Sequence, residues 1–141
     1  MVLSPIGKQC DIYSENKDKN PNYAHCSWND LKEMKDSGLV EIQNHSYNMH
    51  TITKNRRGTK KNKNESFEHY QNAFCSDVNL MQNKIAEYLD TTPTTFVFPF
   101  GAISNCSLDI LRQLGFKAIL NCEGKIIREV VAELAARLDG R

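Results

Sequence analysis

Three short, strand-like segments in this chain each follow a segment with helical periodicity. The helices are predicted at residues 27–38, 66–90 and 104–115, and the strands that follow them at 39–43, 94–98 and 116–120. Successive strands joined through a helix favour parallel pairing with right-handed crossovers. The sequence therefore predicts the α/β class, with parallel strands and crossover helices. Ligands of such folds gather at the carboxyl ends of the strands.

The first predicted helix has clear signals at both ends. Ser27 is a suitable N-cap, and Asp30 follows three residues later in the first turn. Leu31 and Met34 fall on one face, and Gly38 is suited to the left-handed residue that ends a helix. A strand begins directly after this glycine.

The second predicted helix is the longest periodic segment of the chain. Asn64 or Ser66 is expected to cap it, and it is expected to end near Asp90. Apolar residues spaced by three or four predict one buried face, formed by Phe67, Tyr70, Phe74, Val78, Met81, Ile85 and Leu89. The strand after it, residues 94–98, is almost wholly apolar and is therefore expected in the middle of a sheet.

Length and charge set limits on the organisation of the chain. With 141 residues it is long enough for one domain. Its net charge of +1 gives no overall basic field, so nucleic acid is not an expected partner. Residues 54–63 form a local basic run without aromatic residues for base stacking. We interpret the run as a solvated, mobile loop; the alternative is a patch that attracts anionic polymers such as cell-wall glycans.

The two ends of the chain differ from its middle. Residues 1–26 are polar and poorly periodic, and we expect an irregular N-terminal segment there. Residues 123–141 predict an amphipathic helix whose composition changes abruptly, because no Asn or Lys follows Lys125. This tail is interpreted as appended or out of register, which leaves 27–122 as the main domain. No apolar run spans a membrane, the start does not resemble a signal peptide, and nothing indicates an oligomeric state.

His45 and His50 lie just past the end of the first predicted strand. Side chains five residues apart on a helix would point about 140° away from each other, whereas a turn after a strand can bring them together. Neutral imidazole is the commonest protein ligand of zinc, so the pair is a candidate metal site. Ser46 could brace the turn through its hydroxyl group. The alternative is two surface histidines without a shared ligand.

The strand at 94–98 is followed by Pro99, Phe100 and Gly101. A turn of this kind exposes backbone N–H groups at the edge where ligands gather, and such donors can stabilise an oxyanion. The alternative is an ordinary strand exit.

Together these segments resemble a known family. Residues 27–50 are similar to the second motif region of the polysaccharide deacetylases, the NodB-homology carbohydrate esterases. Residues 96–101 resemble the third motif of that family, and residues 107–118 resemble the helix and strand that follow it. The resemblance covers roughly residues 27–122 and implies a partial (β/α) barrel.

The resemblance also implies an activity, a metal-dependent removal of N-acetyl groups from a glycan. It makes His45 and His50 ligands of a divalent ion, usually Zn²⁺, and makes Ser46 the residue that orients the ligand loop. The backbone N–H of Phe100 would stabilise the oxyanion, and Pro99, Phe100 and Gly101 would contact the substrate. The parent protein would then work outside the membrane or in the cell envelope on an N-acetylated glycan.

The sequence departs from the family pattern at the acidic residues. None of its eight aspartates has an aspartate neighbour, so the Asp-Asp-Gly motif that supplies a metal carboxylate and a general base is missing. Val97 stands where an arginine is common, the histidine spacing is one residue long, and no histidine follows His69. We expect the motif upstream of residue 1 and no catalysis by these residues alone. A non-catalytic glycan-binding relic and a generic α/β domain are the alternatives.

Overall fold

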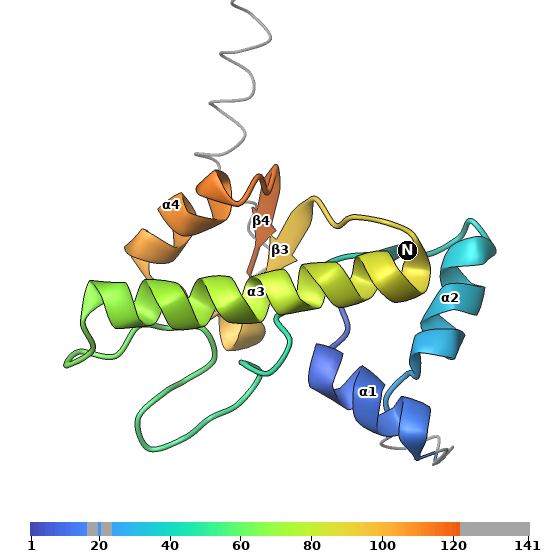
Figure 1. Ribbon diagram of the computed structural model, residues 1–141, viewed down its shortest axis with the longest axis horizontal. Helices are drawn as coiled ribbons and strands as arrows, with labels where there is room; N and C mark the ends of the chain where they lie inside the picture. Colours follow the sequence, from blue (N-terminus) through green and yellow to red (C-terminus); the bar gives the residue numbers. More distant parts are fainter. Residues whose placement is uncertain (17–19, 21–23, 122–141) are drawn as a thin grey trace, which may run out of the picture.

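The computed structural model describes residues 1–16, 20 and 24–121 (Figure 1). Along the chain these residues form β1 (Val2–Leu3), α1 (Gly7–Glu15), α2 (Trp28–Asp36), β2 (Glu41–Ile42), α3 (Phe67–Leu89), β3 (Thr95–Val97), a 3-10 turn (Pro99–Gly101), α4 (Asn105–Gln113) and β4 (Ala118–Leu120). The helix predicted at 123–141 lies outside the described residues.

All strand pairs in the described part of the chain are parallel. β1 pairs with β2, and β3 pairs with β4. A single parallel bridge between Asn44 and Phe96 joins the two pairs, so the strands follow one another in the order of the chain. The Asn44 N–H donates to the Thr95 carbonyl (3.2 Å), and the Val97 N–H donates to the Asn44 carbonyl (2.8 Å). The predicted α/β class with parallel strands is confirmed, although β2, β3 and β4 are each shorter than predicted.

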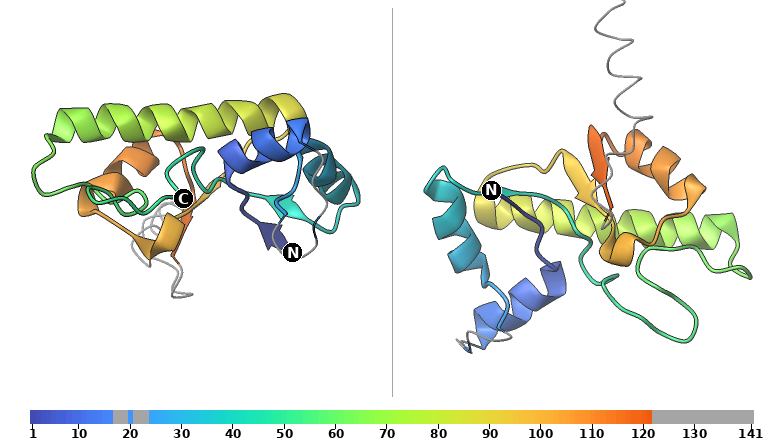
Figure 2. Two further views of the ribbon diagram at one scale, coloured as in Figure 1. Left: turned by 90° about the horizontal axis from the view of Figure 1, so that it is seen from below. Right: turned by 180° about the vertical axis from the view of Figure 1, so that it is seen from behind.

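The long helix α3 lies along one side of all the strands (Figure 2, left). Ser66, one of the two caps predicted for this helix, accepts a hydrogen bond from the His69 N–H (3.2 Å). Its periodic apolar residues are fully buried, with one exception: Phe67 is 51% exposed. Phe67 is the first residue of the helix and lies beyond the end of the core, so its place on the buried face was predicted wrongly.

Two clusters of buried side chains lie side by side along α3. The aromatic cluster joins α3 to β3, α4 and β4, and it consists of Tyr70, Phe74, Val78, Phe96, Phe98, Ile110, Leu111, Phe116 and Ile119. The N-terminal cluster joins the other end of α3 to α1, α2 and β2, and it consists of Cys10, Trp28, Leu31, Ile42, Met81, Ile85 and Leu89. One helix therefore contributes to both parts of the core.

The irregular structure expected for residues 1–26 is wrong for much of that segment, because it contains β1 and α1. Gly7 allows the first turn of α1 to approach α3, since a Cβ atom there would lie 2.5 Å from the Met81 sulfur and 2.7 Å from the Tyr47 ring. Only Gly7 and Cys10 of this helix are buried. Two small buried residues give no helical periodicity that sequence reasoning could detect.

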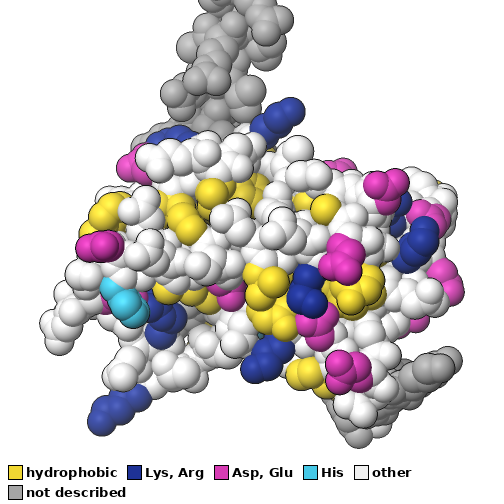
Figure 3. Space-filling view, in the orientation of Figure 1, with side chains coloured by type: hydrophobic (Ala, Val, Ile, Leu, Met, Phe, Trp, Pro, Cys, Tyr) yellow, Lys and Arg dark blue, Asp and Glu magenta, His cyan; other side chains and the backbone are white. Residues whose placement is uncertain are grey.

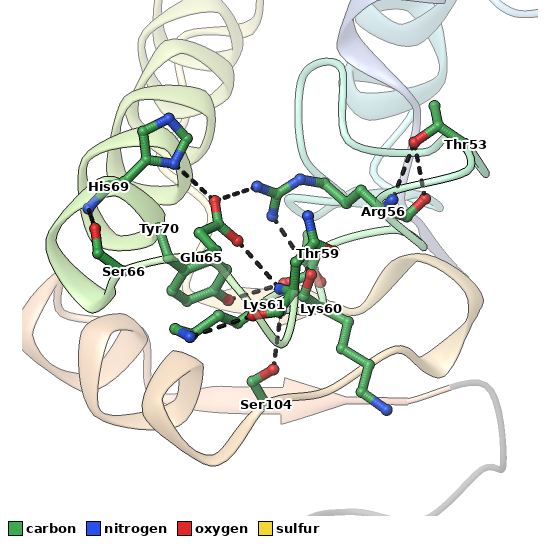
Figure 4. A network of polar contacts seen from close by, with 11 residues as sticks. Thr53, Arg56, Thr59, Lys60, Lys61, Glu65, Ser66, His69, Tyr70 and Ser104 are labelled. Carbon is green, nitrogen blue, oxygen red and sulfur yellow. Dashed lines mark hydrogen bonds and ion pairs between the residues drawn. The ribbon is translucent and has the colours of Figure 1, made fainter.

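The basic run is anchored at several points, contrary to the mobile loop that we expected (Figure 4). The Thr59 hydroxyl donates to the Ala102 carbonyl (3.1 Å), and the Tyr70 hydroxyl donates to the Thr59 carbonyl (2.8 Å). The Lys61 N–H donates to the Ser104 hydroxyl (3.0 Å). These contacts tie the loop to α3 and to the segment after β3.

No helix among the described residues is both long enough and apolar enough to cross a membrane. Of the five cysteines, the four at described positions are all free thiols.

Candidate active site

His45 follows β2 directly and is held by the neighbouring strand. Its Nδ1 lies 2.7 Å from the Val97 carbonyl oxygen. A carbonyl group can only accept a hydrogen bond, so Nδ1 carries the proton and Nε2 keeps its lone pair. Histidines that bind metals are commonly held by a carbonyl in this way, so the arrangement makes His45 a candidate ligand through Nε2.

The surroundings of His45 favour its neutral form. Burial lowers the pKa of this imidazole, and the neighbouring His50 lowers it further, although the hydrogen bond to Val97 acts in the opposite direction. The net effect is a pKa below the usual value for histidine. A metal ion binds the neutral ring, so less competition from protons is expected at this position.

His50 lies beside both His45 and the turn after β3. The ring centroids of His45 and His50 are 5.0 Å apart, and those of His50 and Phe100 are 4.2 Å apart. The predicted site residues therefore come together in space, although 49 residues of chain lie between His50 and Phe100.

The turn between the two histidines is held by buried polar groups. Ser46 is fully buried and has a positive φ of 70°. Its N–H donates to the Asn44 side-chain oxygen (2.9 Å), and its hydroxyl accepts from the Met49 N–H (3.2 Å). The Asn44 amide group in turn donates to the Val78 carbonyl (3.1 Å) on α3. The hydroxyl–backbone bond is the brace that was expected of Ser46.

Asp77 on α3 also holds this turn, and sequence reasoning missed it. One carboxylate oxygen accepts the Tyr47 N–H and the other accepts the Asn48 N–H, both at 2.8 Å. Burial raises the pKa of Asp77, although the two hydrogen bonds oppose this change. Its position beside the buried Val78 was the available signal, since an acidic residue bordering a buried helical face requires donors near it.

The 3-10 turn at Pro99–Gly101 contains two residues with positive φ values. Gly101 has a φ of 60°, and Phe100 has a φ of 56°, which is unusual for a residue with a side chain. Strained conformations of this kind cost roughly 1–3 kcal/mol and cluster at functional sites. Pro99 is buried, while Phe100 and Gly101 are partly exposed. The Gly101 N–H donates to the Phe98 carbonyl (3.1 Å) and the Ala102 N–H donates to the Pro99 carbonyl (3.0 Å), and these two bonds close the turn around Phe100.

The donor set fits part of a zinc site. A catalytic zinc ion has three protein ligands, and His45 and His50 could supply two of them. Among residues 1–16, 20 and 24–121, no three His, Cys, Asp or Glu side chains gather as a set of ligands. A hollow of about 680 Å³ lies elsewhere, between α1, α2 and the end of α3, and none of the predicted site residues lines it.

The family follows from a comparison with known proteins. A family model described as polysaccharide deacetylase matches residues 6–119. The chain belongs to the polysaccharide deacetylase family. The match begins before residue 27, so α1 also lies within the family's domain.

Relatives of this polysaccharide deacetylase family member include a poly-beta-1,6-N-acetyl-D-glucosamine N-deacetylase of Staphylococcus aureus. It is 25% identical over 106 residues, which are 75% of this chain and 34% of that protein. The chain thus spans about a third of the length of the curated relatives that it matches.

Solved structures of similar proteins have the same fold. A de-N-acetylase from Aggregatibacter actinomycetemcomitans has a TM-score of 0.69 at 23% identity, covering 84% of this chain and 51% of that one. IcaB from Ammonifex degensii has a TM-score of 0.59 at 26% identity, covering 77% and 45%. The fold predicted from the family resemblance is therefore confirmed.

Proposed function

We propose that the protein is a metal-dependent hydrolase that removes N-acetyl groups from a glycan. The main support is the convergence of His45 and His50 beside the turn at Pro99–Gly101, in a chain of the polysaccharide deacetylase family. The name of its Staphylococcus aureus relatives, poly-beta-1,6-N-acetyl-D-glucosamine N-deacetylase, supports N-acetylglucosamine polymers as the substrate class. The proposal concerns the whole protein, for which we also propose a location outside the membrane or in the cell envelope.

In this proposal His45 and His50 hold a divalent ion, with Zn²⁺ preferred because both donors are imidazoles. When bound, such an ion lowers the pKa of a coordinated water toward ~7 and polarises the acetyl carbonyl. His45 offers Nε2 because Val97 holds the proton on Nδ1. Ser46 keeps the ligand turn in shape, and the Phe100 N–H donates a hydrogen bond to the developing oxyanion. Pro99 and Gly101 shape the turn that the acetyl group contacts.

A zinc titration of the 141-residue chain tests the ligands. Removing either imidazole by His45→Ala or His50→Ala should weaken zinc binding by about tenfold or more, because each would remove one of two donors. His25→Ala and His69→Ala are matched controls, since both rings are exposed and lie outside the site. Equal binding by all four variants and the unchanged chain would reject the metal site.

One observation favours a second candidate, a glycan-binding protein without catalysis: no two aspartates are adjacent in the sequence. The two candidates differ in acetate release. Incubation of the whole protein with an N-acetylglucosamine oligomer and zinc should release acetate if the first is right. Binding of the oligomer without any release of acetate would favour the second.

A further inference from the structure

The loop of residues 51–64 begins directly after His50 and forms a hairpin. The Thr53 N–H donates to the Arg56 carbonyl (2.8 Å), and the Gly58 N–H donates to the Thr51 carbonyl (2.9 Å). Ile52 and Arg57 form an antiparallel bridge between its two arms. The base of the hairpin is therefore next to one of the two candidate ligands.

The hairpin returns to the site at Gly58. A Cβ atom at this position would lie 2.7 Å from the Pro99 carbonyl oxygen and 3.3 Å from the Phe100 ring, so the two backbones are in close contact. Phe100 in turn packs against His50. The loop therefore forms part of the rim of the candidate active site, and its position is fixed by the anchors at Thr59 and Lys61.

All charged side chains of this loop are basic. Lys54, Arg57, Lys60 and Lys63 are exposed, and none of them forms an ion pair with a described residue. Lys and Arg side chains stand out from the lower part of the molecule in Figure 3, where the loop lies below α3 in Figure 1.

The first acidic residue after the basic run, Glu65, forms no ion pair with these four cations. The Glu65 side chain is only 6% exposed and pairs with Arg56 and His69. It also accepts the Asn62 N–H (3.1 Å). One basic residue of the run, Arg56, thus holds the loop in place, while the four exposed cations form no ion pair within the part of the chain that the structure describes. Since the whole chain has a net charge of only +1, this concentration of charge is local.

We propose that the four exposed cations, named here the cationic rim, recognise carboxylate or phosphate groups on the N-acetylated glycan that enters the site. This inference rests on the proposed function and specifies its substrate class. Fixed positive charge at the edge of a site attracts anionic ligands and repels cationic ones. A glycan that has already lost acetyl groups carries ammonium groups, so the cationic rim should also disfavour rebinding of the product.

The polyanion that the cationic rim fits is a glycan rather than a nucleic acid. Single-stranded nucleic acids are held by aromatic side chains on which bases stack, interleaved with basic residues. Residues 51–64 contain no aromatic residue, and Tyr70 beside them is fully buried.

Binding of four soluble probes of equal length to the 141-residue chain tests the proposal at low salt. The probes are a carboxymethylated, a phosphorylated, an unmodified and a partly de-N-acetylated N-acetylglucosamine oligomer. The anionic oligomers should bind most tightly and the de-N-acetylated one most weakly, with the differences decreasing as salt is added. The two anionic probes distinguish carboxylate from phosphate as the preferred group.

Two double variants test whether the preference for anionic oligomers arises from the cationic rim. Lys54→Gln with Arg57→Gln should weaken binding of the anionic oligomers by about threefold to tenfold and leave the neutral one unchanged. Lys35→Gln with Lys117→Gln removes the same charge at the opposite, amino end of the strands and should change neither. Thermal unfolding of both variants checks that the fold is intact.

Several results would overturn the proposal. They are equal binding of anionic and neutral oligomers, no binding of any anionic oligomer, equal effects of the two double variants, or tighter binding of an oligonucleotide of the same charge. None of these outcomes alters the zinc titration of the His45 and His50 variants, so failure of the cationic rim can be distinguished from failure of the metal site.

Discussion

The two ends of α3 are packed in different ways. The aromatic cluster depends on ring contacts: Phe96 lies edge-on to Phe74, Phe98 and Phe116, with centroids 5.1–5.8 Å apart. The N-terminal cluster is instead bordered by a partly exposed carboxylate: Asp11 accepts hydrogen bonds from the Trp28 ring N–H (2.7 Å) and the Tyr47 hydroxyl (2.7 Å) and pairs with Lys84 (2.9 Å). Apolar packing does not depend on pH, whereas hydrogen bonds and ion pairs to a carboxylate do. The two ends should therefore respond differently to mutation and to acid.

The largest effect is expected in the aromatic cluster. Phe96→Ala would leave a cavity among three rings, and it should lower the free energy of unfolding by about 3–5 kcal/mol. Urea unfolding at pH 7 and at pH 5 measures this loss, which should be the same at both values. Phe96→Leu is the matched control, with a smaller expected loss of about 1–2 kcal/mol. A loss that depended on pH would contradict the view that ring packing stabilises this cluster.

The second-largest loss of stability is expected at Asp11. Asp11→Asn replaces an acceptor of three donors by a group that must itself donate, and it should cost about 1–3 kcal/mol at pH 7. Burial raises the pKa of Asp11, but the three hydrogen bonds and the charge of Lys84 outweigh burial and lower it below its usual value.

The direction of the pH dependence follows from that lowered pKa. The stabilisation by ionised Asp11 is complete above the unfolded pKa of 3.8 and is lost as pH falls through the lower folded value. The difference between the unchanged chain and Asp11→Asn should therefore shrink below about pH 4. Fluorescence of Trp28, the only tryptophan, reports on this cluster directly. Asp36→Asn, which breaks only exposed ion pairs, should change neither stability nor its pH dependence.

Asp77 connects α3 to the site between the two clusters. Asp77→Asn removes one of two acceptors that hold the turn carrying His45 and His50, so zinc should bind about tenfold more weakly. Asp109→Asn on α4, an exposed position, is the control. Unchanged zinc affinity in a folded Asp77→Asn variant would show that the turn keeps its shape without this carboxylate.

The smallest effects are expected at the helix caps. Ser27 caps α2 with a complete capping box, in which Asp30 accepts the Ser27 N–H (2.9 Å). Ser66 caps α3 with one side-chain bond. Ser27→Ala and Ser66→Ala should each cost about 1 kcal/mol, with the larger loss for Ser27. Chemical unfolding of the two variants side by side measures the difference, and a larger loss for Ser66→Ala would show that helix length outweighs the second bond.

The aromatic half was predictable from sequence because its signals are periodic. The spacing of Tyr70, Phe74 and Val78 gave the helix, and the apolar run around Phe96 gave the strand. Much of the N-terminal half was not predictable from sequence, because its contacts depend on small or polar residues. Gly7 and Cys10 bury one helix without a periodic stripe.

The candidate site, too, was only partly predictable from the sequence. His45, His50 and the turn at Pro99–Gly101 were identified from residue type and position after strands, and the structure brings them together. The supporting groups, Asn44 and Asp77, were missed, since hydrogen bonds between distant segments leave no local pattern. The anchoring of the basic loop was missed for the same reason.

The sharing of α3 between the two clusters has a consequence for how the molecule could be divided. A cut at the hairpin tip, between Lys54 and Asn55, would leave one fragment with both histidines and another with α3 and the Pro99–Gly101 turn. The N-terminal cluster would then become an interface between the two fragments, because α3 contributes Met81, Ile85 and Leu89 to it. Neither fragment alone would have a full core or a full site, so reassembly of the split protein should restore folding and zinc binding in a single step.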